Sequence, residues 1–281
     1  MDVEINNGLH ATAHSRYTLY NRLAVNISGT ELTALIGAYL WPLFRVSAMV
    51  AAAPVFGTRS VPTKVKIMTA LAITSVLVPI LPVPEVNVFS PLAVIVIAQQ
   101  ILIGLIIGFT VQLVFSAVIT GGQIVAMQMG LGFSLMVDPQ NGSQSPVLSQ
   151  FYVVMVMLIY LAIDGHLVLI EVLAESFKTM PISSEGLVAN DFMQVVRWGA
   201  NIFAGGMAIS LPAIASLLVV NIAFGIMTRS APQLNVFAIG FPITMMLGFT
   251  LVMITLPNIA PQSTSLFSNV YHLIQTILGI K

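Results

Sequence analysis

The stretch FSPLAVIVIAQQILIGLIIGFTVQLVFSAVITGGQIVAMQMGLGFSLMV, residues 89–137, decides the fold of this chain. No Asp, Glu, Lys or Arg interrupts it, and aliphatic side chains predominate. Because a membrane helix needs about 20 apolar residues, the first part, 89–119, predicts a membrane-spanning helix. The part from residue 121 is too apolar for a solvated loop, yet its glycines (121, 122, 130 and 132) make a regular helix unfavourable.

The composition of the whole chain also indicates a membrane protein. Of 281 residues, 57% are hydrophobic and 7% are charged, and the mean hydropathy is +0.98. Soluble domains carry about 25% charged residues. Residues 1–30 are polar and of mixed charge, without the basic start and apolar core of a signal peptide. Ten basic residues balance ten acidic ones, which gives no indication of nucleic-acid binding.

The charge-free intervals place the predicted helices. Pro42, Pro212 and Pro242 lie inside apolar segments, where each removes a backbone donor and favours a kink. The sequence lacks the short alternating apolar runs of a membrane β-barrel. We therefore predict an all-α, polytopic, membrane-associated protein whose proline-kinked helical segments form hairpins. Six hydrophobic segments are expected, at about 32–56, 63–82, 89–119, 146–164, 198–227 and 236–260, with an amphipathic tail at about 264–279.

The charges between the segments indicate an orientation. Arg59, Lys64 and Lys66 follow the first segment, and loops rich in basic residues favour the cytoplasm. The stretch 164–191 holds five acidic residues and one lysine. That composition fits the side opposite the basic loop.

Two arginines and one pair of glycines stand out against the apolar background. Arg45 lies within the first segment, where a charge needs a partner or a watery cavity. Two roles are open for it: an ion pair or carbonyl clamp with a partner subunit, or a direct role in a pore. Arg229, between the fifth and sixth segments, fits an interfacial anchor. Gly104 and Gly108 form a GxxxG, a spacing that lets two helix backbones touch, although small residues are also common in membrane helices.

The sequence contains no motif of a familiar catalytic or cofactor site. A phosphate-binding GxxxxGK[ST] loop, an HExxH zinc helix and a GxSxG nucleophile elbow are all missing from it. Cysteine is absent, which excludes thiolate metal sites, and the four histidines are scattered. Asp164 and His166 are close in sequence, but we interpret them as residues that cap or join helices. We expect neither enzymatic activity nor a cofactor.

Four motifs, in this order and at these separations, resemble one known family. They are RVSAMVAAAPVFG (45–57), GGQIVAMQMGLGFSLMVDP (121–139), GHLVLIEVLAESFKTMP (165–181) and RSAPQLNVFAIGFPI (229–243). Over about residues 32–265, the chain resembles the R subunit of the flagellar type III export gate, the FliR family. The virulence-secretion counterpart is related, but its members tend to carry charge where this chain has QIVAMQMG, and a lysine soon after the last motif's proline. Here Pro242 is followed by Ile243 and Thr244, so the flagellar version fits better.

The resemblance implies a function and a set of partners. Members of the family assemble with several P and Q subunits into a helical channel that passes unfolded flagellar proteins, at the basal body in the bacterial inner membrane. The B and A subunits of the export apparatus are further expected partners. The family is regarded as a structural fusion, which implies a polar extension at 1–31, a P-like part at 32–190 and a Q-like part at 191–281. Its helix hairpins are kinked and lifted partly out of the bilayer.

The resemblance also implies roles for individual residues. In the family, the segment between the third and fourth apolar stretches closes the channel as a plug. Glycines that bend, methionines that deform and a lack of charge suit 120–139 to that use. The expected plug residues are Gly121, Gly122, Gln123, Met127, Met129, Gly130, Gly132 and Phe133. Assembly or structural roles are expected for Arg45, Pro54, Gly104, Gly108, Asp138, Pro139, His166, Arg229, Pro232, Gly240 and Pro242.

Other interpretations of the same features stay open. Residues 121–139 also fit a packed re-entrant loop that has no gating role. A self-contained secondary transporter for a small solute would use broken helices too. Such a transporter usually carries acidic residues within its spans for ion coupling, and the predicted segments have none in their interiors.

Overall fold

The computed structural model describes residues 29–58, 60–82, 86, 88, 90–132, 147–230 and 236–280. Regular structure in these residues is entirely helical, and no strand occurs among them. The α-helices are α2 (Gly29–Ala52), α3 (Thr63–Leu77), α4 (Leu92–Gln128), α6 (Val147–Ala162), α7 (Gly165–Thr179), α8 (Ala189–Trp198), α9 (Ala200–Ser230), α10 (Val236–Thr255) and α11 (Ile259–Leu278), with 3-10 turns η1 (Val78–Ile80) and η2 (Leu256–Asn258).

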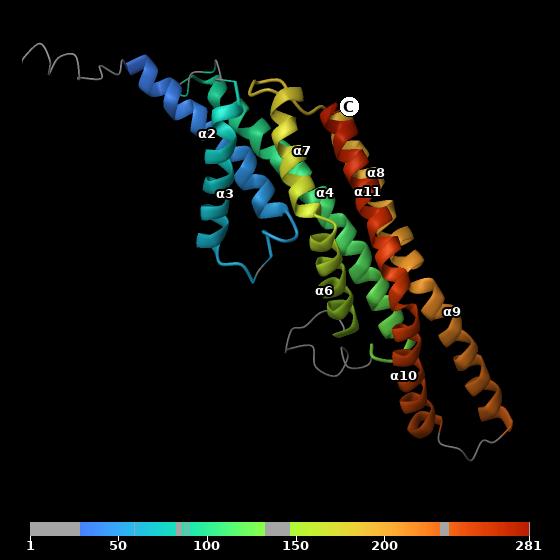
Figure 1. Cartoon of the computed structure of the whole chain (residues 1–281). Coiled ribbons are helices and arrows are strands. Elements are labelled where there is room, and N and C mark those ends of the chain that lie inside the picture. The colour runs from blue at the N-terminus through green and yellow to red at the C-terminus, as the bar shows by residue number, and fades with distance from the viewer. Residues whose placement is uncertain are drawn as a thin grey trace, which may run out of the picture.

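Helix α4 is the centre of the fold. It has 37 residues and no proline, and α2, α6, α7, α9 and α11 all pack against it. Figure 1 shows it crossing the molecule from the end near the C terminus toward the α9–α10 hairpin. Its buried Thr110 donates a hydrogen bond to the carbonyl oxygen of Ile106 at 2.6 Å, so this polar side chain is satisfied within the helix. Most positions from Gly104 to Ala126 are buried or half-buried, whereas Leu92, Val94 and Ile95 in the first turns are exposed.

The GxxxG of α4 receives the α2–α3 hairpin. Gly104 lies against the backbone carbonyl of Arg45 and the side chain of Ala48, so no space is left for a Cβ atom. Gly108, one turn further on, would place a Cβ 2.7 Å from the carbonyl oxygen of Met49. The two glycines thus lie where the backbones of α2 and α4 approach each other, as the spacing permits.

A second close approach occurs near the other end of α4. A Cβ on Gly121 would lie 2.8 Å from the carbonyl oxygen of Gly206 in α9. The next residue, Gly122, faces Ser149 of α6, whose Cα would lie 2.7 Å from an added Cβ. Adjacent glycines therefore admit two different helices, on two faces of α4.

Helices α6 and α7 form a bent pair. They meet at an angle of 63°, and Asp164 between them has φ 55°. The hydroxyls of Tyr160 and Tyr271 both lie within hydrogen-bond distance of the Gly165 carbonyl oxygen, at 2.9 and 2.6 Å. The ring of Tyr160 also packs on Phe267 of α11, with 4.9 Å between the centroids. Aromatic packing between α6 and α11 thus holds the bend in place.

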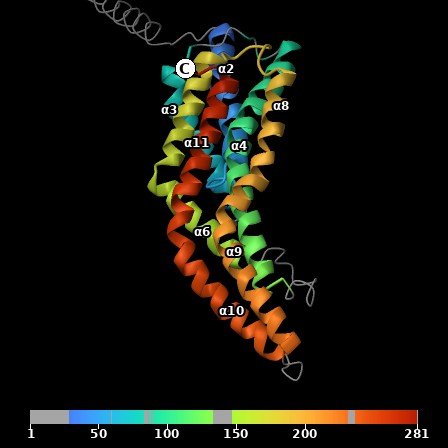
Figure 2. The ribbon, with the colours of Figure 1, turned by 90° about the vertical axis from the view of Figure 1, so that its right-hand side faces the viewer.

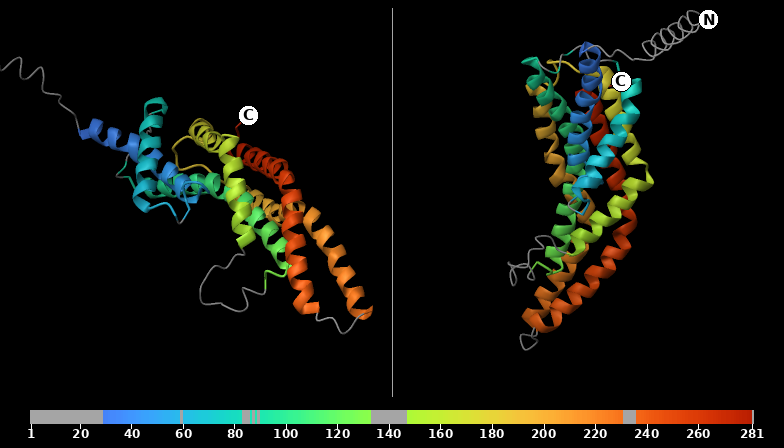
Figure 3. Two further views of the ribbon diagram at one scale, coloured as in Figure 1. Left: turned by 60° about the horizontal axis from the view of Figure 1, so that its bottom comes forward. Right: turned by 90° about the vertical axis from the view of Figure 1, so that its left-hand side faces the viewer.

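The molecule is elongated, and its two ends differ. Figure 2 shows the C-terminal end of α11 beside α7, at the end opposite the α9–α10 hairpin. Both views of Figure 3 show this hairpin extending beyond α6. Rising about 1.5 Å per residue, the 42 residues of the helical stretch Ala189–Ser230 are roughly 60 Å long.

The predicted all-α, polytopic fold is confirmed, with differences in the segments. Within the described ranges, five helices are long and apolar enough to cross a membrane, or six if the α6–α7 pair counts as one span. The third segment, expected to end at residue 119, continues as α4 to Gln128. Neighbouring helices pack against its glycines, and this packing keeps the segment helical. The fourth segment ends at Ala162 but is followed directly by α7, which the prediction missed.

A prediction follows from the α2–α4 contact. Substituting Gly104→Ala should destabilise the protein by about 1–3 kcal/mol, because the new methyl group overlaps the Arg45 backbone, which cannot move aside freely. Gly225→Ala is the matched control, since an added Cβ there meets nothing within 4 Å. The measurement is the temperature at which the detergent-purified protein loses its monodisperse state. Equal midpoints for the two variants would contradict the role of Gly104 as a contact point.

Candidate functional site

The first candidate site surrounds Arg45, which is fully buried. Its Nε donates to the Gln100 side-chain oxygen of α4 at 2.8 Å. One terminal nitrogen donates to the carbonyl oxygen and hydroxyl of Ser176 in α7, at 2.9 and 3.0 Å. The other donates to the Met180 carbonyl oxygen, just after α7, at 2.8 Å. One guanidinium group therefore joins α2, α4 and the end of α7.

All of these acceptors are neutral, so the positive charge of Arg45 is stabilised by dipoles. Ser176 and Met180 supply carbonyls from the C-terminal end of α7, where the helix dipole is negative. The guanidinium also lies over the ring of Phe177, 4.1 Å from its centroid, which adds a cation–π contact. The arrangement is a carbonyl clamp, and its partners lie within this chain.

The neighbouring glutamine of α4, Gln99, bonds to the connection between α7 and α8. The side-chain oxygen of Gln99 accepts a hydrogen bond of 3.3 Å from the backbone N–H of Leu187, which precedes α8. Sequence reasoning missed Gln99, Gln100 and Ser176. The available signal was the pair of glutamines within an aliphatic run, since a buried polar side chain in an apolar helix needs a partner.

The second candidate site is the far end of α4, where the plug residues were expected. Gly121 and Gly122 are buried inside the helix, and Gln123 is half-buried there. Met127 is 63% exposed, whereas Met129 is fully buried. These positions are thus helical up to Gln128, and their side chains point in several directions.

Helix α10 packs across the end of α4. Met129 lies against Gly248, where a Cβ would come within 2.5 Å of its Cγ. Gly130 has φ +81°, a conformation that L side chains resist, and the Phe241 ring lies beside it. The backbone N–H of Gly130 donates to the Met127 carbonyl oxygen at 3.0 Å. Gly130 therefore ends the helix at a contact with α10.

An apolar groove of about 700 Å³ adjoins this end of α4. It lies between the residue after the helix end, the start of α6 and the α10–η2 region. Its lining contains no charged side chain, so it can hold apolar groups and offers no chemistry for catalysis. The lining residues are Leu131, Val147, Leu148, Phe151, Phe249, Val252, Met253 and Leu256.

The other residues expected at functional positions are scattered through the fold. Pro54 is buried just after α2, and His166 is half-buried at the start of α7, with a buried Nδ1 that has no hydrogen-bond partner. Arg229 is exposed in the last turn of α9. Gly240 and Pro242 lie in α10, the glycine buried and the proline exposed, and Gly132 is half-buried after α4. Phe133, Asp138, Pro139 and Pro232 lie outside the described residues.

Neither site contains the groups that a metal requires. In the described part of the chain, no three His, Asp or Glu side chains gather at one point. The geometry of both sites is that of packing between helices.

Comparison with known proteins defines the class. Residues 36–270 match the family described as bacterial export proteins, family 1. The chain is 41% identical over 255 residues to the flagellar biosynthetic protein FliR of Escherichia coli K12, covering 91% of this chain and 98% of that protein. It is 39% identical to FliR of Pectobacterium carotovorum, over 88% of this chain and 95% of that protein, and 27% identical to FliR of Bacillus subtilis, over 88% and 96%. The chain therefore belongs to the flagellar FliR family.

The clamp generates one prediction. Arg45→Leu should destabilise the protein, because each buried acceptor left unpaired costs about 1–3 kcal/mol. Arg45→Lys should be intermediate, since an ammonium lacks the planar fork that reaches Gln100 and Met180 together. Arg197→Leu, on the exposed face of α8, is the control and should change little. Thermal unfolding in detergent measures all three, and an Arg45→Leu variant as stable as wild type would rule out a structural clamp.

A further prediction concerns Gly130, where α4 ends. Gly130→Val should lower stability by at least about 1–2 kcal/mol, because a residue with a Cβ resists positive φ and would also press on Phe241. Gly132→Ala is the control, since its Cβ would make only ordinary contact with Met127, at 3.5 Å. Limited proteolysis of purified protein compares the two. Equal cleavage rates would mean that the turn at Gly130 does not hold the end of α4.

Proposed function

We propose that this protein is a core, channel-forming subunit of the flagellar type III protein export gate in the bacterial inner membrane. The observation that carries the proposal is the 41% identity to a flagellar FliR along nearly the whole of both chains. The family description names export proteins, and the helices include at least five that can cross a membrane. Unfolded flagellar proteins are the proposed cargo.

The proposed partners are the P and Q subunits of the gate, with the B and A subunits of the apparatus nearby. Large apolar side chains remain exposed along α9 and α10, among them Phe203, Met246 and Met253, at 73%, 72% and 77%. Such faces need a cover of lipid or protein. In the proposed division, residues 32–190 are the P-like part and 191–281 the Q-like part. The irregular connection between Thr179 and Ala189 supports a boundary there.

A plug role is part of the proposal for the segment near 120–139. Since Gly121–Gln128 belong to a packed helix, closure of the channel is assigned to the residues beyond Gly130. The apolar groove beside Leu131 supports this assignment, because uncharged walls exclude water and ions.

Deleting the gene tests the proposal as a whole. The deletion should abolish flagella and the appearance of hook and filament proteins in the medium, and this chain expressed from a plasmid should restore both. Tagged protein should co-purify with the P and Q subunits as a large mixed complex. Swimming cells after deletion, or a chain that extracts only as a small homo-oligomer, would refute the export role.

Deleting 133–137 (FSLMV) tests the plug. This change leaves α4, Met129 and Gly130 intact, so the complex should assemble in normal amounts. Cells should become permeable to ions and small solutes, because an apolar barrier has been shortened. Removing as many residues from the polar start of the chain is the control. If the variant assembles and its membrane stays as tight as wild type, the segment has a packing role and no plug role.

A further inference from the structure

We propose that the groove between α2, α3 and α4 binds an anionic phospholipid, with an acyl chain along the groove and the phosphate beside Lys66. The inference is independent of the export function. It concerns the binding of a membrane lipid to the protein.

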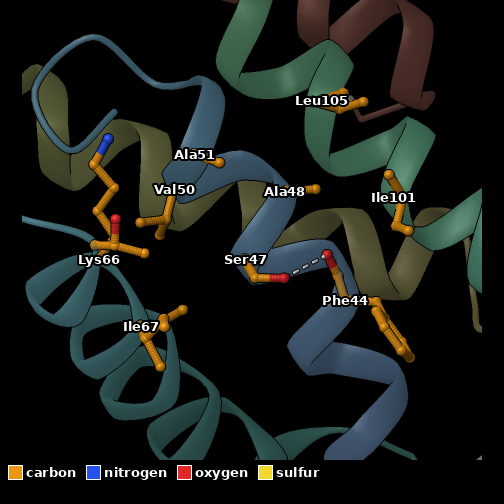
Figure 4. A pocket seen from close by; sticks show the side chains of 11 residues that line it. Phe44, Ser47, Ala48, Val50, Ala51, Lys66, Ile67, Ile101 and Leu105 are labelled. Carbon is orange, nitrogen blue, oxygen red and sulfur yellow. Dashed lines mark hydrogen bonds between the residues drawn. The ribbon is translucent and has the colours of Figure 1, made fainter. Parts of the chain in front are cut away.

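The groove has a volume of about 400 Å³ and an almost entirely apolar wall. Figure 4 shows Lys66 at the end where the loop joins α2 to α3, with Val50 and Ala51 beside it and Phe44 and Ile101 toward the other end. The polar group nearest the middle, the Ser47 hydroxyl, already donates to the Phe44 carbonyl oxygen at 3.1 Å. A hydrocarbon chain lying beside Ser47 would leave this hydroxyl paired.

The basic end of the groove attracts anions. Lys66 donates one hydrogen bond to the Gly57 carbonyl oxygen, at 2.9 Å, which leaves further N–H donors on its ammonium group. Lys64, two residues earlier in the same turn, is exposed on another side of the helix and adds to the positive charge of this end. The first turn of α3 has no acidic residue and no side-chain cap, so the positive end of the helix dipole adds to both charges. Two cations at the N-terminal end of a helix repel its dipole, and a phosphate group would relieve this repulsion.

The hairpin matches a bilayer in length. The apolar spans are Thr33–Ala52 and Thr63–Ile80, of 20 and 18 residues. At 1.5 Å per residue each is about 30 Å long, the thickness of the hydrocarbon core. The lysines at the tip of the hairpin are then at the depth of the phosphates, on the side that basic loops favour. An acyl chain starting at Lys66 would enter the groove in the direction of the bilayer centre.

The volume favours a lipid chain over a helix from another protein. A helix is about 10 Å wide, so roughly one turn would fill 400 Å³. A single hydrocarbon chain is narrow enough to occupy the groove along its length. The occupant is therefore an anionic phospholipid, and a subunit that covers the groove is the competing outcome of the test.

The test uses the full chain in phosphatidylcholine nanodiscs that contain a trace of a lipid with a photoreactive acyl chain. In one sample this lipid is phosphatidylglycerol, and in the other it is phosphatidylcholine. Mass spectrometry locates the crosslinks. Phosphatidylglycerol should label residues lining the groove, such as Ile67, Ile101 and Leu105, roughly tenfold more than phosphatidylcholine. The double variant Lys64→Gln/Lys66→Gln should remove this preference, and Lys66→Arg alone should retain it.

Two controls separate the site from general effects. Lys178→Gln removes an exposed lysine from α7 and should leave the preference unchanged. Ala51→Leu fills the groove and should reduce labelling by both lipids, whereas Ala204→Leu on the exposed face of α9 should not. Monodispersity and thermal midpoint verify that each variant is folded. Equal labelling by the two lipids, or a groove that is labelled in the lone chain but protected in the assembled complex, would overturn the proposal.

Discussion

The rest of the structure depends on how closely other helices approach α4. At Gly104 and Gly108 the backbone of α2 lies where side chains would normally stand, and Gly121 and Gly122 admit α9 and α6 in the same way. In lipid, apolar side chains alone give helices little reason to associate, so contact between backbones supplies much of the packing energy. Helix α4 has 37 residues and no charged side chain, and five other helices pack against it. The glycines on its surface let α2, α6 and α9 come close enough for backbone contact.

The buried charge of Arg45 complements these contacts. Van der Waals packing has little directionality, whereas a guanidinium with acceptors on two other helices permits only one arrangement of α2, α4 and the end of α7. Burying an ion without an ionic partner is expensive. Here the carbonyls at the end of α7 and the Phe177 ring offset that expense. The clamp thus determines a geometry that the apolar surfaces leave undetermined.

Sequence patterns predicted the helical class and the approximate position of most spans, because long charge-free runs have few alternatives. They failed where tertiary contacts decide. Glycines 121 and 122 indicated a bendable segment by propensity, but Gly206 and Ser149 occupy the space and keep the helix continuous. For Arg45, the sequence indicated that a partner exists, while its partners at 100, 176 and 180 are distant along the chain. The two glutamines of α4 indicated that they need partners, but no local pattern could have paired Gln100 with Arg45.

Helix length also constrains where this protein can lie. The stretches Ala189–Ser230 and Gly240–Leu278 have 42 and 39 residues, so each is about 60 Å long. The hydrocarbon core of a bilayer is about 30 Å thick. A tilt of about 20–40° is too small to fit a helix of this length within that thickness. Only 22% of each stretch's most apolar window is buried within the chain. The part of Gly240–Leu278 that belongs to α11 exposes polar side chains, among them Gln262, Asn269 and His272, which suit it to a place outside the hydrocarbon core. The length of these helices alone thus places part of each stretch outside the hydrocarbon core, independently of the family to which the chain belongs.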